Sequence, residues 1–186
     1  VIGAGAAGLM ASGVAGENGN EVIVVERNDK VARKVMITGK GRCNVTNNCT
    51  LVNELIANVP TNGRFLYGAF SRFMPIDTME FFEDMGVPVK VERGNRVFPE
   101  SDKAVDIVDA LNKYITQNGV KRKTARVTEL IIEDGAVKGC RTEDGAEHYA
   151  DNVLVATGGK SYPVTGSTGD GYILAKKFPV FRDFVT

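Results

Sequence analysis

The residues Val1-Ile2-Gly3-Ala4-Gly5-Ala6-Ala7-Gly8 open the chain and decide its fold. The first glycine permits a tight turn after a strand, the second lets the backbone approach a pyrophosphate, and the third lets helix and strand pack closely. The small residues from Ala6 to Gly19 predict a short helix, and residues 21–26 predict a buried parallel strand. Together these segments predict a β-α-β unit that binds a dinucleotide.

Glu26 stands at the end of the second strand, eighteen residues after Gly8, near the spacing of the acidic residue in dinucleotide-binding folds. A carboxylate there accepts hydrogen bonds from ribose hydroxyls. A glycine-rich turn without a ligand is the alternative for an isolated motif. Here a strand precedes the glycines, a helix follows them and Glu26 completes the unit, so the pattern favours nucleotide binding.

The chain is predicted to form one α/β domain over residues 1–186, a Rossmann-like FAD/NAD(P)-binding domain with a parallel sheet. Two parts extend it: a helical excursion over residues 49–119 and a three-stranded β-meander over residues 126–151. Asp134-Gly135 and Asp144-Gly145 mark the tight turns of the meander, because these dipeptides tolerate the positive φ of hairpin turns. A further strand over residues 152–156 runs into Thr157-Gly158-Gly159.

Two elements stand out within the excursion. Residues 75–86 predict a helix, and its core-facing side is expected to carry Ile76, Met79, Phe82 and Met85. Residues 87–92 and 96–98 predict a short hairpin across the turn Arg93-Gly94-Asn95.

A second helix is expected at the end of the excursion. Ser101 should cap it, Asp102 should lie in its first turn, and Gly119 should close it after Gln117. Its periodic apolar residues are expected to face inward: Ala104, Ile107, Val108, Leu111 and Ile115.

Composition favours a small-molecule site. The 186 residues include 23 Lys and Arg and 23 Asp and Glu, so no net charge attracts nucleic acid or an anionic membrane. The apolar runs are far shorter than the roughly 20 residues that span a bilayer, and the first residues lack the basic stretch, apolar core and small-residue cleavage site expected of a signal peptide. The three cysteines lack metal-type spacing and suit a reducing compartment. We expect a cytoplasmic protein with no metal, nucleic-acid or membrane partner; the sequence does not indicate an oligomeric state.

Both ends of the sequence suggest a segment of a longer protein. Val1-Ile2 stands directly before the glycines, although a buried strand normally runs about 5 residues. Residues 178–186 carry no recognisable stop. We therefore expect the chain to be incomplete at both ends and, by itself, to bind its dinucleotide less tightly than its full-length parent and to lack activity.

The order of the predicted elements separates FAD from NAD, which the glycine motif alone does not. A β-α-β unit, an excursion, a meander and a strand ending in Ala156-Thr157-Gly158-Gly159 resemble the glutathione-reductase-type FAD-binding fold. The chain holds one G-x-G-x-x-G motif, so no separate nicotinamide domain lies within it.

Three longer blocks carry a closer resemblance. They are Thr38 to Asn47 (TGKGRCNVTN), Gly94 to Ser101 (GNRVFPES) and Ala156 to Tyr172 (ATGGKSYPVTGSTGDGY). The chain resembles the NAD(P)/FAD-dependent oxidoreductases of the aminoacetone-oxidase-like or BaiN-like type. The similarity runs from Val1 to about Lys177, after which Phe178-Pro179 replaces the family's glycine-histidine continuation.

The resemblance implies a flavin site. The block around Gly39 and Arg42 would lie along the flavin and its phosphates, and Thr168-Gly169-Asp170 would face the ribityl chain and ring; a plain surface charge is the alternative for Arg42. The predicted cofactor-binding residues are Gly3, Gly5, Ala6, Ala7, Gly8, Glu26, Arg27, Lys34, Thr38, Gly39, Gly41, Arg42, Cys43, Asn44, Val127, Ala156, Thr157, Gly158, Gly159, Thr168, Gly169 and Asp170.

The predicted function is hydride transfer through FAD between NAD(P)H or a substrate and an organic acceptor. The flavin supplies the chemistry, so a shortage of acid and base side chains does not argue against an enzyme. The sequence identifies neither the substrate nor catalytic residues. One alternative is a disulfide reductase that uses Cys43 and Cys49, although five residues separate them where such enzymes have four. Another is a non-catalytic nucleotide-binding fragment.

Overall fold

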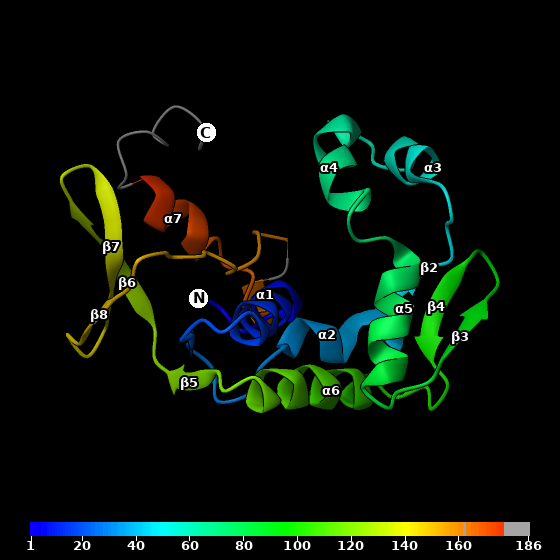
Figure 1. The fold of residues 1–186 in the computed structure, drawn as a ribbon, viewed down its shortest axis with the longest axis horizontal. Coiled ribbons are helices and arrows are strands. Elements are labelled where there is room, and N and C mark those ends of the chain that lie inside the picture. Colours follow the sequence, from blue (N-terminus) through cyan, green and yellow to red (C-terminus); the bar gives the residue numbers. More distant parts are fainter. Residues whose placement is uncertain (162, 177–186) are drawn as a thin grey trace. The chain divides into compact units, whose positions relative to one another are not determined.

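The computed structural model describes residues 1–161 and 163–176, and the chain divides into two compact units (Figure 1). Unit 1 comprises Val1–Lys34 and Leu111–Thr186, and unit 2 comprises Val35–Ala110. Most of the predicted excursion over residues 49–119 falls in unit 2. The predicted departure from the family after Lys177 lies outside the described residues.

Unit 1 contains the β-α-β unit, the meander and the carboxyl-terminal helix. Its elements are α1 (Ala6–Glu17), β1 (Ile23–Glu26), the second half of α6 (Ala104–Gln117), β5 (Lys121–Thr124), β6 (Val127–Glu133), β7 (Ala136–Thr142), β8 (Glu147–Tyr149), η3 (Pro163–Thr165) and α7 (Asp170–Lys176). The α/β fold class predicted from the sequence is confirmed.

The parallel part of unit 1 is built around the amino-terminal residues. β1 pairs with β5 in parallel, with Val24 opposite Arg122. Ile2 bridges Val25 on one side and Val155 on the other, both in parallel. The predicted strand over residues 152–156 is therefore present as a single bridge at Val155.

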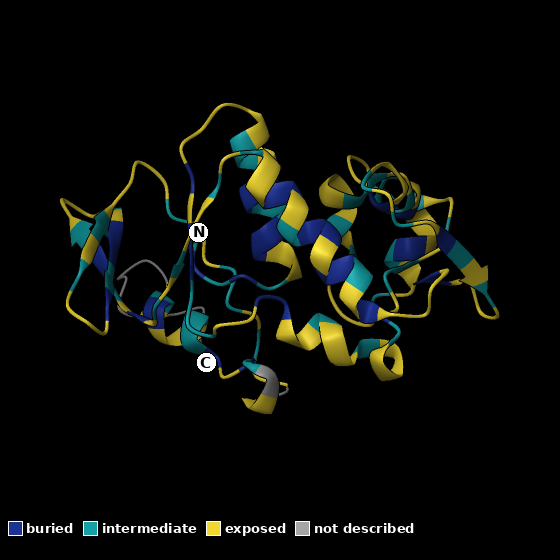
Figure 2. Ribbon diagram, turned by 90° about the horizontal axis from the view of Figure 1, so that it is seen from below, coloured by how far each residue is buried: buried dark blue, intermediate teal, exposed yellow. Residues whose placement is uncertain are grey.

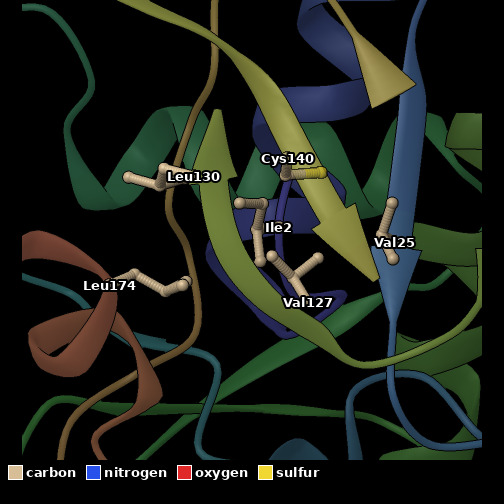
Figure 3. Close-up of a cluster of buried hydrophobic side chains, with 6 residues drawn as sticks. All are labelled: Ile2, Val25, Val127, Leu130, Cys140 and Leu174. Atoms are coloured by element: carbon tan, nitrogen blue, oxygen red, sulfur yellow. The ribbon is translucent and has the colours of Figure 1, made fainter. Parts of the chain in front are cut away.

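The meander covers one face of this parallel arrangement. β6, β7 and β8 form an antiparallel sheet in sequence order, as the two Asp-Gly turns predicted. The core beneath it joins the meander to the parallel strands and α7, as Figure 3 shows for Ile2, Val25, Val127, Leu130, Cys140 and Leu174. Val24, the residue before Val25, is fully buried as well. Because successive strand residues point to opposite faces, the Val24 side chain lies on the face opposite that of Val25.

Unit 2 consists of short helices around a small antiparallel sheet. Its elements are α2 (Arg33–Ile37), η1 (Thr38–Gly41), β2 (Thr46–Asn47), α3 (Val52–Ala57), η2 (Gly63–Leu66), α4 (Tyr67–Phe70), α5 (Pro75–Asp84), β3 (Val89–Glu92), β4 (Arg96–Pro99) and the first half of α6 (Ala104–Gln117). The sheet order is β2-β4-β3, and α5 contacts β2 and β3. The predicted hairpin is confirmed, with positive φ at Gly94 and Asn95.

The helices carry buried and exposed sides (Figure 2). On α6 all the predicted inward residues are buried: Ala104, Ile107, Val108, Leu111 and Ile115. The predicted start of this helix is wrong, because Asp102 has φ +58°, which no helical residue adopts. The helix begins at Ala104, and the Ser101 hydroxyl accepts a bond from the Lys103 amide at 3.3 Å.

The prediction for α5 is partly wrong. Phe82 is buried, but Ile76 is 51 % exposed, so the core-facing side is narrower than the apolar periodicity indicated. None of the helices in residues 1–161 and 163–176 combines the length and apolar character needed to cross a bilayer.

Candidate nucleotide-binding site

The three glycines of the opening motif have different surroundings. A Cβ added at Gly3, where φ is +99°, would lie 2.7 Å from the Ala156 carbonyl oxygen, and one added at Gly8 would lie 1.9 Å from the Gly3 carbonyl oxygen. A Cβ at Gly5 would meet nothing within 4 Å. Gly3 and Gly8 are therefore needed for packing, whereas the space beside Gly5 is open to a ligand.

The amino-terminal end of α1 borders the same space. Gly5 is the N-cap of this 12-residue helix, and no side chain caps it. Ala6 and Ala7 are exposed. The first amides of a helix have no intrahelical partner and bind anions well. This geometry fits a pyrophosphate.

The Glu26 carboxylate is fixed at the end of β1. Its Oε2 accepts from the Ala4 amide at 2.8 Å, and its Oε1 accepts from the Asn28 amide and side chain at 2.9 and 2.5 Å. A carboxylate has about four acceptor positions, so about one remains for a ribose hydroxyl. Sequence reasoning missed Asn28, whose only signal is its place two residues after Glu26.

The turn over residues 156–159 packs against the glycine motif. The Ala156 amide donates to the Ile2 carbonyl at 2.8 Å, and Thr157 Oγ1 lies 2.5 Å from where a Cβ on Gly171 would be. The Gly159 carbonyl accepts from the Gly169 amide at 3.1 Å. Unit 1 thus brings the opening motif, the 156–159 turn and the start of α7 together.

The remaining candidates of unit 1 lie around α7 and β6. Arg27 bonds to Thr168 and Asp170, and Lys34 Nζ lies 3.4 Å from Ser161 Oγ. Val127 is buried. It also lines an open pocket of about 160 Å³, whose other lining residues are Arg126, Thr128, Asp170, Ile173 and Leu174. Arg126, which sequence reasoning missed, directly precedes Val127.

The Thr38–Asn44 block lies in unit 2. Gly39 and Gly41 have φ of +55° and +85°. A Cβ on Gly39 would lie 2.9 Å from the Phe98 ring, whereas near Gly41 the closest atom would be 4.0 Å away. The Asn44 side-chain amide lies beside backbone carbonyls of β2 and β4. Gly39 is therefore a packing glycine, and Gly41 leaves open space.

Arg42 is held by carboxylates of its own unit. Its guanidinium donates to Glu92 and to Asp102 and lies 4.2 Å from the centroid of the Phe98 ring. These hydrogen bonds, first with Glu92 and then with Asp102, raise the pKa of Arg42, and the bond with Arg42 lowers the pKa of Glu92. The pKa of Asp102 is lowered first by its hydrogen bond with Lys90 and then by that with Arg42. Sequence reasoning missed both acidic partners, since they lie 50 and 60 residues away. The predicted phosphate role of Arg42 stays a prediction.

The two cysteines of the disulfide-reductase alternative differ. Both are free. Cys43 is 5 % exposed, and burial raises the pKa of its thiol, an effect that a hydrogen bond with Thr38 partly offsets. Cys49 Sγ lies near the Leu51 carbonyl and Glu54 Oε2, at 3.4 and 3.5 Å. A buried thiol with a raised pKa is a poor nucleophile for disulfide exchange.

The fold and the glycine-rich site define a Rossmann-like dinucleotide-binding domain. The model of the HI0933-like protein Rossmann domain matches residues 1–181. The chain belongs to this HI0933-like family, which confirms the predicted family and FAD-binding fold.

Curated relatives and a solved structure agree with this assignment. The chain is 32 % identical over 180 residues to the 3-dehydro-bile acid delta(4,6)-reductase of Clostridium scindens, covering 95 % of the chain and 42 % of the relative. It is 31 % identical to the ribosomal RNA dihydrouridine synthase of Escherichia coli, covering 96 % and 43 %. Iminodiacetate oxidase from Chelativorans sp. BNC1 shares the fold with a TM-score of 0.55 at 14 % identity, covering 86 % and 55 %. The chain spans less than half of these curated relatives.

Proposed function

We propose that the full-length protein is an FAD-dependent reductase that passes hydride from NAD(P)H to a carbon–carbon double bond of a small organic acceptor. The names of both curated relatives, a delta(4,6)-reductase and a dihydrouridine synthase, denote the reduction of such bonds. The two relatives act on different molecules, a bile acid and ribosomal RNA. The balanced charge of this chain supports the small acceptor.

The role of this chain is to hold the cofactor. The amides at the start of α1 would bind the pyrophosphate, because no side chain caps that helix end. The Glu26 carboxylate would accept from the adenosine ribose, since the Ala4 and Asn28 amides already fix its orientation. FAD, when bound, supplies the hydride-transfer chemistry.

One observation carries the proposal. A side chain at Gly3 or Gly8 would collide with backbone atoms, whereas the space beside Gly5 between them is open. A glycine turn that served packing alone would have no need of a glycine at that middle position, where φ is −76° and other residues are allowed. The openness of Gly5 therefore supports ligand binding over a merely structural turn.

The test uses the full-length protein under anaerobic conditions. We expect purified protein to carry FAD, NADH or NADPH to bleach its flavin absorbance, and a conjugated steroid ketone or simple cyclic enone to restore that absorbance. Reoxidation by ribosomal RNA alone would contradict the small-acceptor part of the proposal. Protein that retains no FAD after reconstitution would contradict all of it.

A further inference from the structure

The guanidinium of Arg27 is bonded to a turn far along the chain. Arg27 directly follows β1, and its side chain is 26 % exposed. Nη1 donates to Thr168 Oγ1 at 3.1 Å and to Asp170 Oδ2 at 3.0 Å, and Nη2 donates to the Gly166 carbonyl at 3.0 Å. These three acceptors lie 141, 143 and 139 residues later in the sequence.

Asp170 is held from several sides at the start of α7. Its side chain is 17 % exposed. Oδ1 accepts from Thr168 Oγ1 at 2.9 Å and lies 3.6 Å from Arg126 Nη2, while Oδ2 accepts from Arg27. Because both members of the Arg27–Asp170 pair are mostly buried, solvent screens this ion pair less than an exposed one.

Backbone hydrogen bonds also hold the turn over residues 166–170. The Thr168 amide donates to the Gly166 carbonyl at 3.0 Å, and the Gly169 amide donates to the Gly159 carbonyl at 3.1 Å. A Cβ on Gly166 would lie 3.6 Å from Arg27 Nη2, so the guanidinium packs directly on the backbone of the turn. Arg27 thus connects this turn to the end of β1.

We propose that Arg27 is a positioning residue for the flavin cofactor, acting by fixing the Gly166–Asp170 turn rather than by touching the cofactor. The inference rests on the proposed FAD function. Both terminal nitrogens of Arg27 already donate to protein acceptors, so the charge beside Glu26 is directed at Asp170. Three of the five N–H donors of the guanidinium are used in this way, which favours the turn over a phosphate on the ribose, the other use of an arginine at this place in dinucleotide-binding folds.

The test is a double-mutant cycle in the full-length protein with the variants Arg27→Met, Asp170→Asn and their combination. The readout is the dissociation constant of FAD, measured by flavin fluorescence as the apoprotein is titrated. We expect each single variant to weaken binding by about tenfold or more, as for the loss of a charge-assisted pair. The double variant should bind FAD no more weakly than the single variant with the lower FAD affinity, because both changes break the same contact.

A second readout does not depend on FAD. Hydrogen exchange of the apoprotein should be faster in Arg27→Met at the amides of residues 166–172 and unchanged in α1. Arg27→Lys should restore part of the protection and of the FAD affinity, since an ammonium replaces some of the three bonds. Arg122→Met, on the neighbouring strand β5, is the matched control and should change neither readout.

The outcomes separate this inference from the proposed function. If Arg27→Met leaves the hydrogen exchange of residues 166–172 unchanged, the proposal is overturned. If, in addition, the losses of FAD affinity in Arg27→Met and Asp170→Asn are additive, Arg27 contacts the cofactor directly. Failure of the parent protein to bind FAD would overturn the function, whereas the exchange measurement would still show whether Arg27 fixes the turn.

Discussion

The backbone amide of Ala4 donates a 2.8 Å hydrogen bond to Oε2 of Glu26. This bond joins the glycine-rich turn that follows Ile2 to the end of β1. It also holds the carboxylate against the turn, so one residue both shapes the turn and offers the candidate ribose contact.

Replacing Glu26 by lysine should weaken FAD binding strongly. The change removes the acceptor of the Ala4 and Asn28 amides, and hydrogen bonds to a charged group contribute about 1.5–3 kcal/mol, or roughly tenfold or more in affinity. Glu21→Lys is the control, because Glu21 is exposed and, within residues 1–161 and 163–176, pairs with Lys121 alone. Retention of FAD through dialysis in Glu26→Lys, equal to that of the parent, would show that the assignment is wrong.

The variants Gly5→Ala and Gly8→Ala should fail in different ways. Gly8→Ala should lower the free energy of unfolding by about 1–3 kcal/mol or more, since the new methyl would lie 1.9 Å from the Gly3 carbonyl. Gly5→Ala should leave the stability of the apoprotein within about 0.5 kcal/mol of the parent and weaken FAD binding. Thermal unfolding of the apoproteins and titration with FAD measure the two effects. Equal FAD affinity of Gly5→Ala and the parent would contradict a pyrophosphate beside Gly5.

Because of Tyr114, the free energy of unfolding should fall as the pH rises above about 10, the ordinary pKa of tyrosine. Burial and the 2.6 Å hydrogen bond to Glu17 raise the pKa of Tyr114 to about 12. The unfolded chain therefore loses this proton first, so the stabilising effect is complete below pH 10 and is lost as the pH rises toward 12. Urea unfolding of the parent and of Tyr114→Phe over this interval should give a shallower pH dependence for the variant, and identical slopes would refute the assignment.

The cysteines should prove dispensable for flavin reduction. Cys43→Ser and Cys49→Ser in the full-length protein should each keep most of the rate at which NAD(P)H reduces the flavin. In the parent, iodoacetamide should modify Cys49 faster than Cys43, because burial raises the pKa of the Cys43 thiol. Loss of reduction in both variants, together with a Cys43–Cys49 disulfide found by mass spectrometry, would favour a disulfide reductase.

Local patterns predicted most of the elements correctly. The Asp-Gly turns predicted the meander, and the Arg93-Gly94-Asn95 turn predicted the hairpin of β3 and β4, because turn geometry depends on residues that are neighbours in the sequence. The five apolar residues that periodicity placed on the inner side of α6 are all buried, but Ala110 and Tyr114, which it did not predict, are buried as well. The same rule misplaced Ile76, since periodicity shows which residues share a side of a helix and not how much of that side is covered.

The sequence by itself therefore determined the β-α-β unit, the tight turn at Gly3 and the close packing at Gly8, since these depend on short spacings and on backbone space at single positions. It also determined the family, because the blocks that carry the resemblance are long. Tertiary structure decided the partners of the charged residues. Arg42 bonds to Glu92 and Asp102, and Arg27 bonds to Asp170, across 50 to 143 residues of sequence. A side chain that carries a charge indicates only that it needs a partner; which carboxylate meets it is fixed when packed strands and turns bring distant segments within hydrogen-bonding distance.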